Sequence, residues 1–427
     1  MKKTNGRWII VILLFFATTI NYMDRAIIGV AGPSMMEDLS LSAVEFGILG
    51  SAFFWSYALM QVPVGVIVDK LGARLTYAVA IVWWSLCTIF IAFGRSIGTL
   101  IGFRILMGIG EAPAFPTNTR VISDWLPTRE RGIANGIFNS GTAIGIGLTT
   151  PLIAWMIENW GWKASFIGIG SIGFIWLLFW LHYFRNHPHQ SAIANEAEVE
   201  YIEAGKIDTN QKTTKMASPF QFLKYKSAWG LLFGLFAHNY LTYLMMTWLP
   251  TYLVVERKMT LLKAGFFTML PWIMSFIGNI LGGYLSDSLI KKQWNSIKAR
   301  KTILAIGMLF PLAIIPTIYI ENATMAIILL SIAIGGEGLA AGILWATVSD
   351  VAPKGAEGKL AGLQNFVGNL AGWIAPALTG FLVYQFQNFT WALMIPAMIC
   401  CLASFGYAFL VQNERISIKT DVDRNLV

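Results

Sequence analysis

Long apolar runs alternate with short polar stretches along most of the chain. Twelve of these runs reach the length of about 20 residues that a helix needs to cross a bilayer. The predicted spans are 8–31, 44–68, 74–93, 97–117, 132–155, 164–184, 228–254, 262–286, 302–319, 324–346, 360–385 and 389–411. The pattern therefore predicts an all-α membrane protein of twelve transmembrane helices. We expect two six-helix bundles, 1–184 and 228–411, joined by a central loop, 185–227, and followed by a tail, 412–427.

Composition and charge agree with this map. The 427 residues are 56% hydrophobic and 13% charged, whereas soluble domains carry about 25% charged residues. Of the 31 lysines and arginines, 24 fall on the side of the N-terminus and 5 on the opposite side, and Arg25 and Arg104 lie within spans. Basic loops mark the cytoplasmic side of a membrane. We therefore expect a protein of the cell membrane with both termini and the central loop in the cytoplasm. The net charge of +8 then requires no nucleic-acid partner.

The sequence predicts neither a signal peptide nor a metal or cofactor site. The first apolar run continues to about Val30 without a cleavage site, which predicts a retained span rather than a signal peptide. The three cysteines, Cys87, Cys400 and Cys401, lie in apolar runs without metal-ligand spacing, so we expect neither a metal nor a cofactor.

Charged residues inside predicted spans are the first candidates for function. Arg104 and Glu111 lie seven residues apart, which is two helical turns, so both project from one helix face. A charge at the centre of a span costs roughly 2.5–3.5 kcal/mol on insertion scales, and such residues usually pair and mark a substrate or ion path. The alternative is a buried ion pair that only holds two helices together.

The two halves of the chain resemble each other. Three features match between them: 65–69 (GVIVD) with 283–287 (GYLSD), 123–127 (SDWLP) with 349–353 (SDVAP), and Glu111 with Glu337. The last two matches share an offset of 226 residues. Repeated halves predict a substrate site at their interface, near the middle of the bilayer.

The stretch from Gly65 to Arg74, GVIVDKLGAR, resembles the loop signature of the major facilitator superfamily, G-x-x-x-D-R/K-x-G-x-R/K. The resemblance implies a cytoplasmic latch that changes with the state of the carrier. Its residues are Gly65, Asp69, Lys70, Gly72 and Arg74, with Asp287 in the second half. A tight turn with a satisfied charge is the alternative.

A second resemblance is narrower. The stretch 21–25 (NYMDR), Arg104 and the run 111–120 (EAPAFPTNTR) look like the anion:cation symporter branch of that superfamily, which includes hexuronate, glucarate and galactonate carriers. Residues 200–205 (EYIEAG) are also similar to its sugar-acid members. The resemblance implies inward symport of an organic anion with protons. In it Arg25 and Tyr22 meet the substrate, Asp24 and Glu111 carry protons, and Arg104 tunes them. An arginine suits the first role because it stays charged and can bind a carboxylate with two hydrogen bonds.

Several other polar residues in spans have two readings each. Tyr57 is either a donor to a substrate hydroxyl or an ordinary helix contact, and Trp345 either covers a sugar face or is a packing residue. Asn365 and Asn369 lie four apart on one helix face, where they bind substrate or join helices. His238 is a proton shuttle, a gate or a packing residue. Glu337 acts in conformational change or substrate selection, or is an inherited acid kept protonated by burial.

The sequence lacks the nucleophile–base or metal-ligand patterns of an intramembrane enzyme. It predicts a proton-coupled symporter of a small organic anion, with a sugar acid (hexuronate, aldonate or aldarate) as the favoured substrate. Another carboxylate, aromatic or dicarboxylic, is the alternative, because the seventh and tenth spans are mainly apolar near Leu235 and 343–344. A sensor built on the carrier fold is a further alternative for the function. The expected partners are the anion, protons and the lipid bilayer, with the monomer as the working unit.

Overall fold

The computed structural model describes residues 3–205, 218–353 and 356–416, and within these ranges the chain forms helices and turns but no strand. Parts of the predicted central loop (206–217) and tail (417–427) lie outside the described residues.

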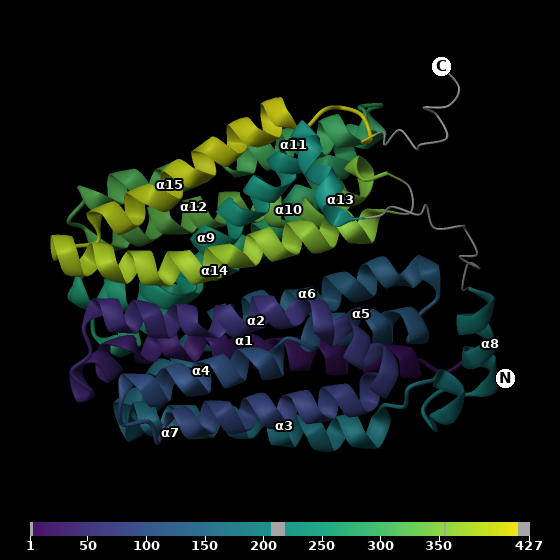
Figure 1. Cartoon of the computed structure of the whole chain (residues 1–427), viewed down its shortest axis with the longest axis horizontal. Coiled ribbons are helices and arrows are strands. Elements are labelled where there is room, and N and C mark those ends of the chain that lie inside the picture. The colour runs from purple at the N-terminus through teal and green to yellow at the C-terminus, as the bar shows by residue number, and fades with distance from the viewer. Residues whose placement is uncertain (1–2, 206–217, 354–355, 417–427) are drawn as a thin grey trace. The chain divides into compact units, whose positions relative to one another are not determined.

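The helices follow one another through the chain (Figure 1). The helices that precede the central segment (188–224) are α1 (Gly6–Asp38), α2 (Ala43–Leu71), α3 (Ala73–Ile91), α4 (Ile97–Glu111), α5 (Ala114–Trp125), η1 (Thr128–Glu130), α6 (Arg131–Gly147) and α7 (Thr150–Tyr183). The central segment holds η2 (Pro188–Gln190), α8 (Glu196–Ala204) and η3 (Pro219–Lys224). The remaining elements are α9 (Lys226–Val255), α10 (Leu261–Lys291), α11 (Ser296–Gly307), η4 (Phe310–Ile318), α12 (Ala323–Ala341), α13 (Leu344–Val351), α14 (Glu357–Phe386), α15 (Thr390–Phe405) and η5 (Gly406–Leu410).

Local sequence explains where several helices begin and end. Ser42 and Glu45 start α2 with a capping box, in which each side chain accepts a hydrogen bond from the other residue's backbone N–H. The predicted span 97–117 lies in one apolar helical segment, Ile97–Trp125, but its helical hydrogen bonding is interrupted: α4 ends at Glu111 and α5 begins after Pro113, while Ala112 and Pro113 keep helical dihedral angles. Proline has no N–H to donate and its ring crowds the preceding turn, so the helix breaks there.

The helices of the structure account for only part of the twelve predicted membrane crossings. Ten helical segments in the described chain are long and apolar enough to cross a membrane. One of them, Thr128–Tyr183, has 56 residues, whereas one crossing needs about 20. Its backbone leaves the helical conformation at Gly161, where φ is +80°. The prediction of twelve spans with cytoplasmic termini therefore stays a prediction.

The chain divides into two compact units. Unit 1 comprises the described residues of Met1–Thr209, Tyr243–Ile273 and Gly372–Phe389, and unit 2 those of Asn210–Thr242, Met274–Ala371 and Thr390–Val427. In unit 1, α1 packs on α6 and α7, and α4 packs on α2 and α3. In unit 2, η4 packs on α12 and α15. These units group residues by contact, and the predicted bundle boundaries 1–184 and 228–411 remain predictions.

The later segments of unit 1 pack closely on α2. The Trp248 indole donates a hydrogen bond to the carbonyl of Pro376 at 3.1 Å, and the Trp373 indole donates to the carbonyl of Phe54 at 2.7 Å. A Cβ at Gly47 would approach the Pro376 oxygen to 2.5 Å, so a side chain there would push α2 and α14 apart. This packing brings α9 to the first helices of the chain.

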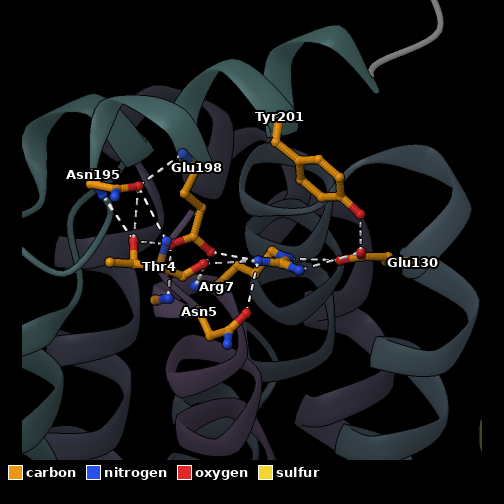
Figure 2. Close-up of polar contacts among 8 residues, drawn as sticks. Thr4, Asn5, Arg7, Glu130, Asn195, Glu198 and Tyr201 are labelled. Carbon is orange, nitrogen blue, oxygen red and sulfur yellow. Dashed lines mark hydrogen bonds and ion pairs between the residues drawn. The ribbon is translucent and has the colours of Figure 1, made fainter. Parts of the chain in front are cut away.

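The predicted central loop contains a helix that is attached to the start of α1 (Figure 2). The buried carboxylate of Glu198 on α8 accepts hydrogen bonds from the backbone N–H groups of Gly6 (2.9 Å) and Arg7 (3.2 Å). It also pairs with the Arg7 guanidinium at 2.7 Å. The first N–H groups of a helix have no partner within the helix, and a negative charge near them is favourable. Glu198 thus caps α1 from another part of the chain.

The same arginine links this cap to the α5–α6 connection. Arg7 Nε donates to Glu130 at 2.7 Å, and the hydroxyl of Tyr201 donates to the other oxygen of Glu130 at 2.5 Å. Arg7 therefore lies between two carboxylates, one of them fully buried. The contacts join α1, α8 and η1 within unit 1.

We expect Glu198→Ala to lower the free energy of unfolding by about 3 kcal/mol, the lower end of the range for breaking a buried pair. The loss leaves two N–H groups of α1 without their acceptor and Arg7 with one carboxylate. Thermal unfolding of the purified protein in detergent measures the effect. Glu200→Ala, on the exposed face of the same helix, is the matched control. Equal melting temperatures for the two variants would show that Glu198 does not stabilise the fold.

Candidate functional site

Six of the predicted site residues meet in unit 1, and an ion pair between two of them forms its centre. The six are Tyr22, Asp24 and Arg25 on α1, Tyr57 on α2, and Arg104 and Glu111 on α4. Arg25 Nε donates to Glu111 Oε2 at 2.7 Å, and their side chains are 1% and 0% exposed. The amide of Asn21 donates to the same carboxylate oxygen at 2.9 Å. One acid on α4 is thereby held by two donors from α1.

In this pairing the partner of Glu111 is Arg25 of another helix and not Arg104 of its own helix. The partner of Arg25 is Glu111 and not its sequence neighbour Asp24. Successive residues of a helix point about 100° apart, so Asp24 and Arg25 face different neighbours. Asp24 lies close to Trp84 and Thr88 of α3. Sequence spacing along α4 was correct in placing Arg104 and Glu111 on the buried side, but it could not show which charge each one meets.

Aromatic rings surround the Arg25 guanidinium. Its central carbon lies 4.8 Å from the ring centre of Tyr22, 4.8 Å from that of Phe53 and 4.5 Å from that of Tyr57. Cation–π attraction favours such positions. The ring of Phe53 also lies 5.1 Å from the Arg104 guanidinium. Both arginines are therefore held against one aromatic side chain.

Arg25 retains a donor that the protein does not use. Its Nη2 atom is buried and has no hydrogen-bond partner among the described residues. Glu111 holds Nε, so Nη2 is the donor that the described residues leave to a ligand. A carboxylate matches a guanidinium edge with two parallel hydrogen bonds. The geometry therefore suits an anion.

Asp24 is the second unusual acid of the site. It is fully buried, with the hydroxyl of Thr88 and the indole N–H of Trp84 beside it, but in the part of the chain that the structure describes neither of its oxygens has a hydrogen bond of normal geometry. An ionised carboxylate in such a place is strongly destabilising unless a cation or a proton reaches it. The charge of Asp24 is thus coupled to what enters the site.

Three residues of the site were missed at the level of sequence. Asn21 lies four residues before Arg25 on the same helix face, so its spacing could have revealed it. Phe53 lies four residues before Tyr57 in the same way, and their rings stack with centroids 5.3 Å apart. Tyr243 on α9 lies near Tyr22 and Arg25, and its ring centroid is 4.1 Å from that of Phe54. No local signal marks Tyr243, because tertiary packing alone brings it to α1 and α2.

The remaining predicted site residues lie in unit 2. The amide of Asn369 donates to the side-chain oxygen of Asn365 at 3.1 Å, which confirms that the two share a helix face. Trp345 on α13 is half exposed. His238 Nδ1 on α9 and Glu337 Oε1 on α12 are in direct contact. Their predicted roles in substrate binding, coupling or gating stay predictions.

The predicted latch residues lie at the ends of helices. Asp69 accepts from Arg120 at 2.9 Å, and Arg120 also binds Asp124 at 2.8 Å. Lys70 is exposed at the last turn of α2, and Gly65 has open space around it. Ion pairs this exposed contribute about 0–1 kcal/mol, so they can break easily.

The turn after α2 is more firmly fixed. Gly72 has φ of +76°, which other residues adopt only with strain, and it separates α2 from α3. Arg74 donates to the carbonyl of Leu181 at 2.8 Å. In unit 2 the repeat match of Asp124, Asp350, binds Arg300 at 2.8 Å, while Asp287 is exposed. A state-dependent latch remains a prediction for all of these residues.

Comparison with known proteins identifies the family. Residues 14–376 match the sequence profile described as Major Facilitator Superfamily. The chain belongs to the major facilitator superfamily. It is therefore a multi-pass transporter of the cell membrane and not an enzyme.

Relatives of this transporter with known names cover almost the whole chain. It is 36% identical to "Probable galactarate/D-glucarate transporter GudP" of Bacillus subtilis (strain 168), over 100% of this chain and 97% of the relative. It is 35% identical to "D-galactonate transporter" of Escherichia coli O6:H1, over 97% of each protein. These names confirm the predicted resemblance to the anion:cation symporter branch.

Solved structures support the fold of the transporter. A bacterial homolog of the human lysosomal transporter Spinster, solved in an inward-facing and occupied conformation, superposes with a TM-score of 0.79. The match covers 96% of this chain and 97% of that one at 18% identity. At this identity the likeness shows the fold alone.

The two acids of the site differ in partners, and we expect them to differ in their effect on stability. Glu111→Ala should lower the free energy of unfolding by about 3–5 kcal/mol, because it leaves Arg25 buried without its partner. Asp24→Asn should change it little, because the carboxylate has no hydrogen bond of normal geometry to lose. Thermal unfolding of each purified variant compares them. A loss for Asp24→Asn as large as that for Glu111→Ala would contradict this description of the site.

Proposed function

We propose that this transporter imports a small sugar acid (a hexuronate, aldonate or aldarate) together with protons by alternating access. The observation that carries the proposal is the buried Arg25, whose Nε donates to Glu111 while its Nη2 has no hydrogen-bond partner among the described residues. The relatives named for galactarate, glucarate and galactonate support a sugar acid as the substrate.

We further propose twelve crossings with both termini in the cytoplasm. The 56-residue segment Thr128–Tyr183 then makes two crossings, on either side of Gly161. The 30-residue α9 adds one more to the ten apolar segments. The strong bias of basic residues to one side of this map supports the orientation.

Charge balance in the site explains why protons would accompany the anion. Arg25 and Arg104 balance Asp24 and Glu111, and all four side chains are buried. An anion that enters this neutral site would add an unbalanced charge in surroundings of low dielectric. Protonation of Glu111 removes one negative charge and frees Arg25 Nε, so a monoanion then restores neutrality.

The protonation of Asp24 determines how much net charge crosses the membrane with the substrate. If Asp24 is also protonated, two protons accompany one monoanion, and one net positive charge moves inward. Each elementary charge that crosses 100 mV contributes about 2.3 kcal/mol. A negative cell interior would then promote accumulation of the substrate.

A symporter of a less hydroxylated carboxylate is the second candidate. The rings of Tyr22, Phe53, Tyr57 and Tyr243 provide a mainly aromatic surround for Arg25. Such surroundings offer few hydrogen bonds to sugar hydroxyls and would suit an aromatic acid. The tyrosine hydroxyls are the donors that a sugar acid would use.

A transport assay distinguishes these substrates. The purified protein is placed in liposomes with an acidic exterior and offered labelled galacturonate, galactonate, glucarate, an aromatic acid and a dicarboxylic acid. We expect saturable accumulation of one sugar-acid class above its external concentration, and this accumulation should disappear when the pH gradient is abolished. Uptake confined to the aromatic acid would favour the second candidate, and uptake of none would contradict both.

For Arg25→Lys we expect affinity for the transported acid to fall roughly 10- to 100-fold, the equivalent of a charged hydrogen bond worth about 1.5–3 kcal/mol. Lysine keeps the charge but cannot present two parallel donors. Calorimetry on the purified protein measures the affinity. Arg95→Lys, at an exposed position, is the matched control. Wild-type affinity in Arg25→Lys would remove Arg25 from the substrate site.

A further inference from the structure

We propose that His238 and Glu337 form a second proton-binding pair, which lies in unit 2 and carries a proton of its own through the transport cycle. The proposal rests on the proposed proton-coupled function, and it adds a site that the Arg25–Glu111 pair does not explain.

The first support is geometric. Nδ1 of His238 on α9 is in direct contact with Oε1 of Glu337 on α12, although the two residues are 99 positions apart in the chain. The Glu337 side chain is 3% exposed and that of His238 is 17% exposed. Within residues 3–205, 218–353 and 356–416, neither group has another hydrogen-bond or ion-pair partner. The charge of each is therefore set by the other.

The backbone around Glu337 leaves little room for water or a further side chain. Glycines flank the acid at positions 335, 336 and 338. A Cβ at Gly338 would approach the carbonyl oxygen of Ser275 on α10 to 2.5 Å, and one at Gly336 would overlap the ring of Phe310 on η4. This close packing encloses the acid, so its main route to solvent is through the partly exposed imidazole.

Among the residues that the structure describes, no fixed charge of a neighbouring element contacts His238 or Glu337. The titratable side chains buried beside α9 are Tyr240 on α9 itself, Cys400 on α15 and Tyr407 on η5, and groups of these types are neutral near pH 7. Among the described residues of unit 2 the charged side chains of the packed elements lie in the last turns of α10, the first half of α11 and the first turn of α14; they include Asp287, Arg300, Lys301, Glu357 and Lys359. Arg300 binds Asp350, and Lys301 donates to the carbonyl of Val411.

The internal repeat relates the His238–Glu337 pair to the Arg25–Glu111 pair. Glu337 matches Glu111 at the offset of 226 residues, and each acid meets a base from the first helix of its predicted half. In the first half that base is Arg25, which stays charged at all physiological pH values. In the second half it is His238, a side chain whose ordinary pKa of about 6.5 lies within that range. The repeat therefore replaces a fixed cation with one that can lose its proton.

The two pairs consequently differ in what they can bind. With an arginine, the pair changes charge only when the acid is protonated, and its cation is available to an anion. With a histidine, the pair is neutral when it holds one proton and has a charge of −1 when it holds none. A charge of −1 is costly in an enclosed site, so proton release requires that water reaches the imidazole. The ligand of this pair is a proton.

Equilibrium accumulation in liposomes counts the protons. Each proton that accompanies the substrate multiplies its accumulation by about tenfold per pH unit of gradient, since one pH unit corresponds to about 1.4 kcal/mol per proton. The probe is the acid of the panel above with the highest uptake. His238→Gln and Glu337→Gln should each lower the slope of log accumulation against the pH gradient by one. The double variant should lose no more than either single one, because the two groups act as a unit.

His238→Arg separates proton binding from structural contact. It places a fixed cation beside Glu337, which keeps the acid ionised because no anion competes for this cation, so the slope should again fall by one. Ser331→Ala, a buried polar residue on the same α12, is the matched control and should keep the wild-type slope. If Glu337→Gln does not fold, the His238 variants carry the test, because they leave the acid in place.

The outcomes distinguish this proposal from the proposed function. A wild-type slope of zero would overturn proton-coupled transport and the second site together. A positive wild-type slope that stays unchanged in folded His238→Gln and His238→Arg would overturn the second site alone.

Discussion

The structure depends on one constraint, which is that a full arginine charge must be kept inside a bundle of apolar helices. Arg25 is 1% exposed and has one ion-pair partner, Glu111, and three aromatic rings. Because a buried pair contributes little net stability, its presence here is better explained by function than by folding. The unpaired Nη2 is the visible consequence: the protein satisfies the cation enough to tolerate it and leaves a donor for a ligand.

The rest of unit 1 can be understood as support for this site. The break after Glu111 places that acid at the end of α4, and Asn21 fixes one of its oxygens from α1. Close packing of α9 and α14 on α2 brings Tyr243 to the arginine. Glu198 caps the far end of α1 from the central segment, so the helix that carries Asp24 and Arg25 is held at its start as well.

Sequence reasoning identified the long apolar helical segments and the charged residues within them because these signals are local. It missed the break at Pro113 by treating one apolar run as one helix, although the missing N–H of proline was visible in the sequence. It could not show that Arg25 pairs with Glu111, because pairing depends on the direction of side chains between helices. The packing of α8 on the start of α1 was also not predicted, because a polar stretch between spans is typical of a loop. Only the tertiary structure shows that Glu198 contacts the first N–H groups of α1. Tyr243 could be found only from tertiary packing.

The central claim is that Glu111 and the substrate carboxylate compete for Arg25, and that a proton on Glu111 decides between them. The most direct test is the affinity for the transported acid, measured by calorimetry across a range of pH values in the wild type and in Glu111→Gln. In the wild type we predict that affinity falls as pH rises, because each bound proton contributes about tenfold per pH unit. In Glu111→Gln the slope should be smaller by one proton, since glutamine imitates the protonated acid. A slope identical to that of the wild type would contradict the account.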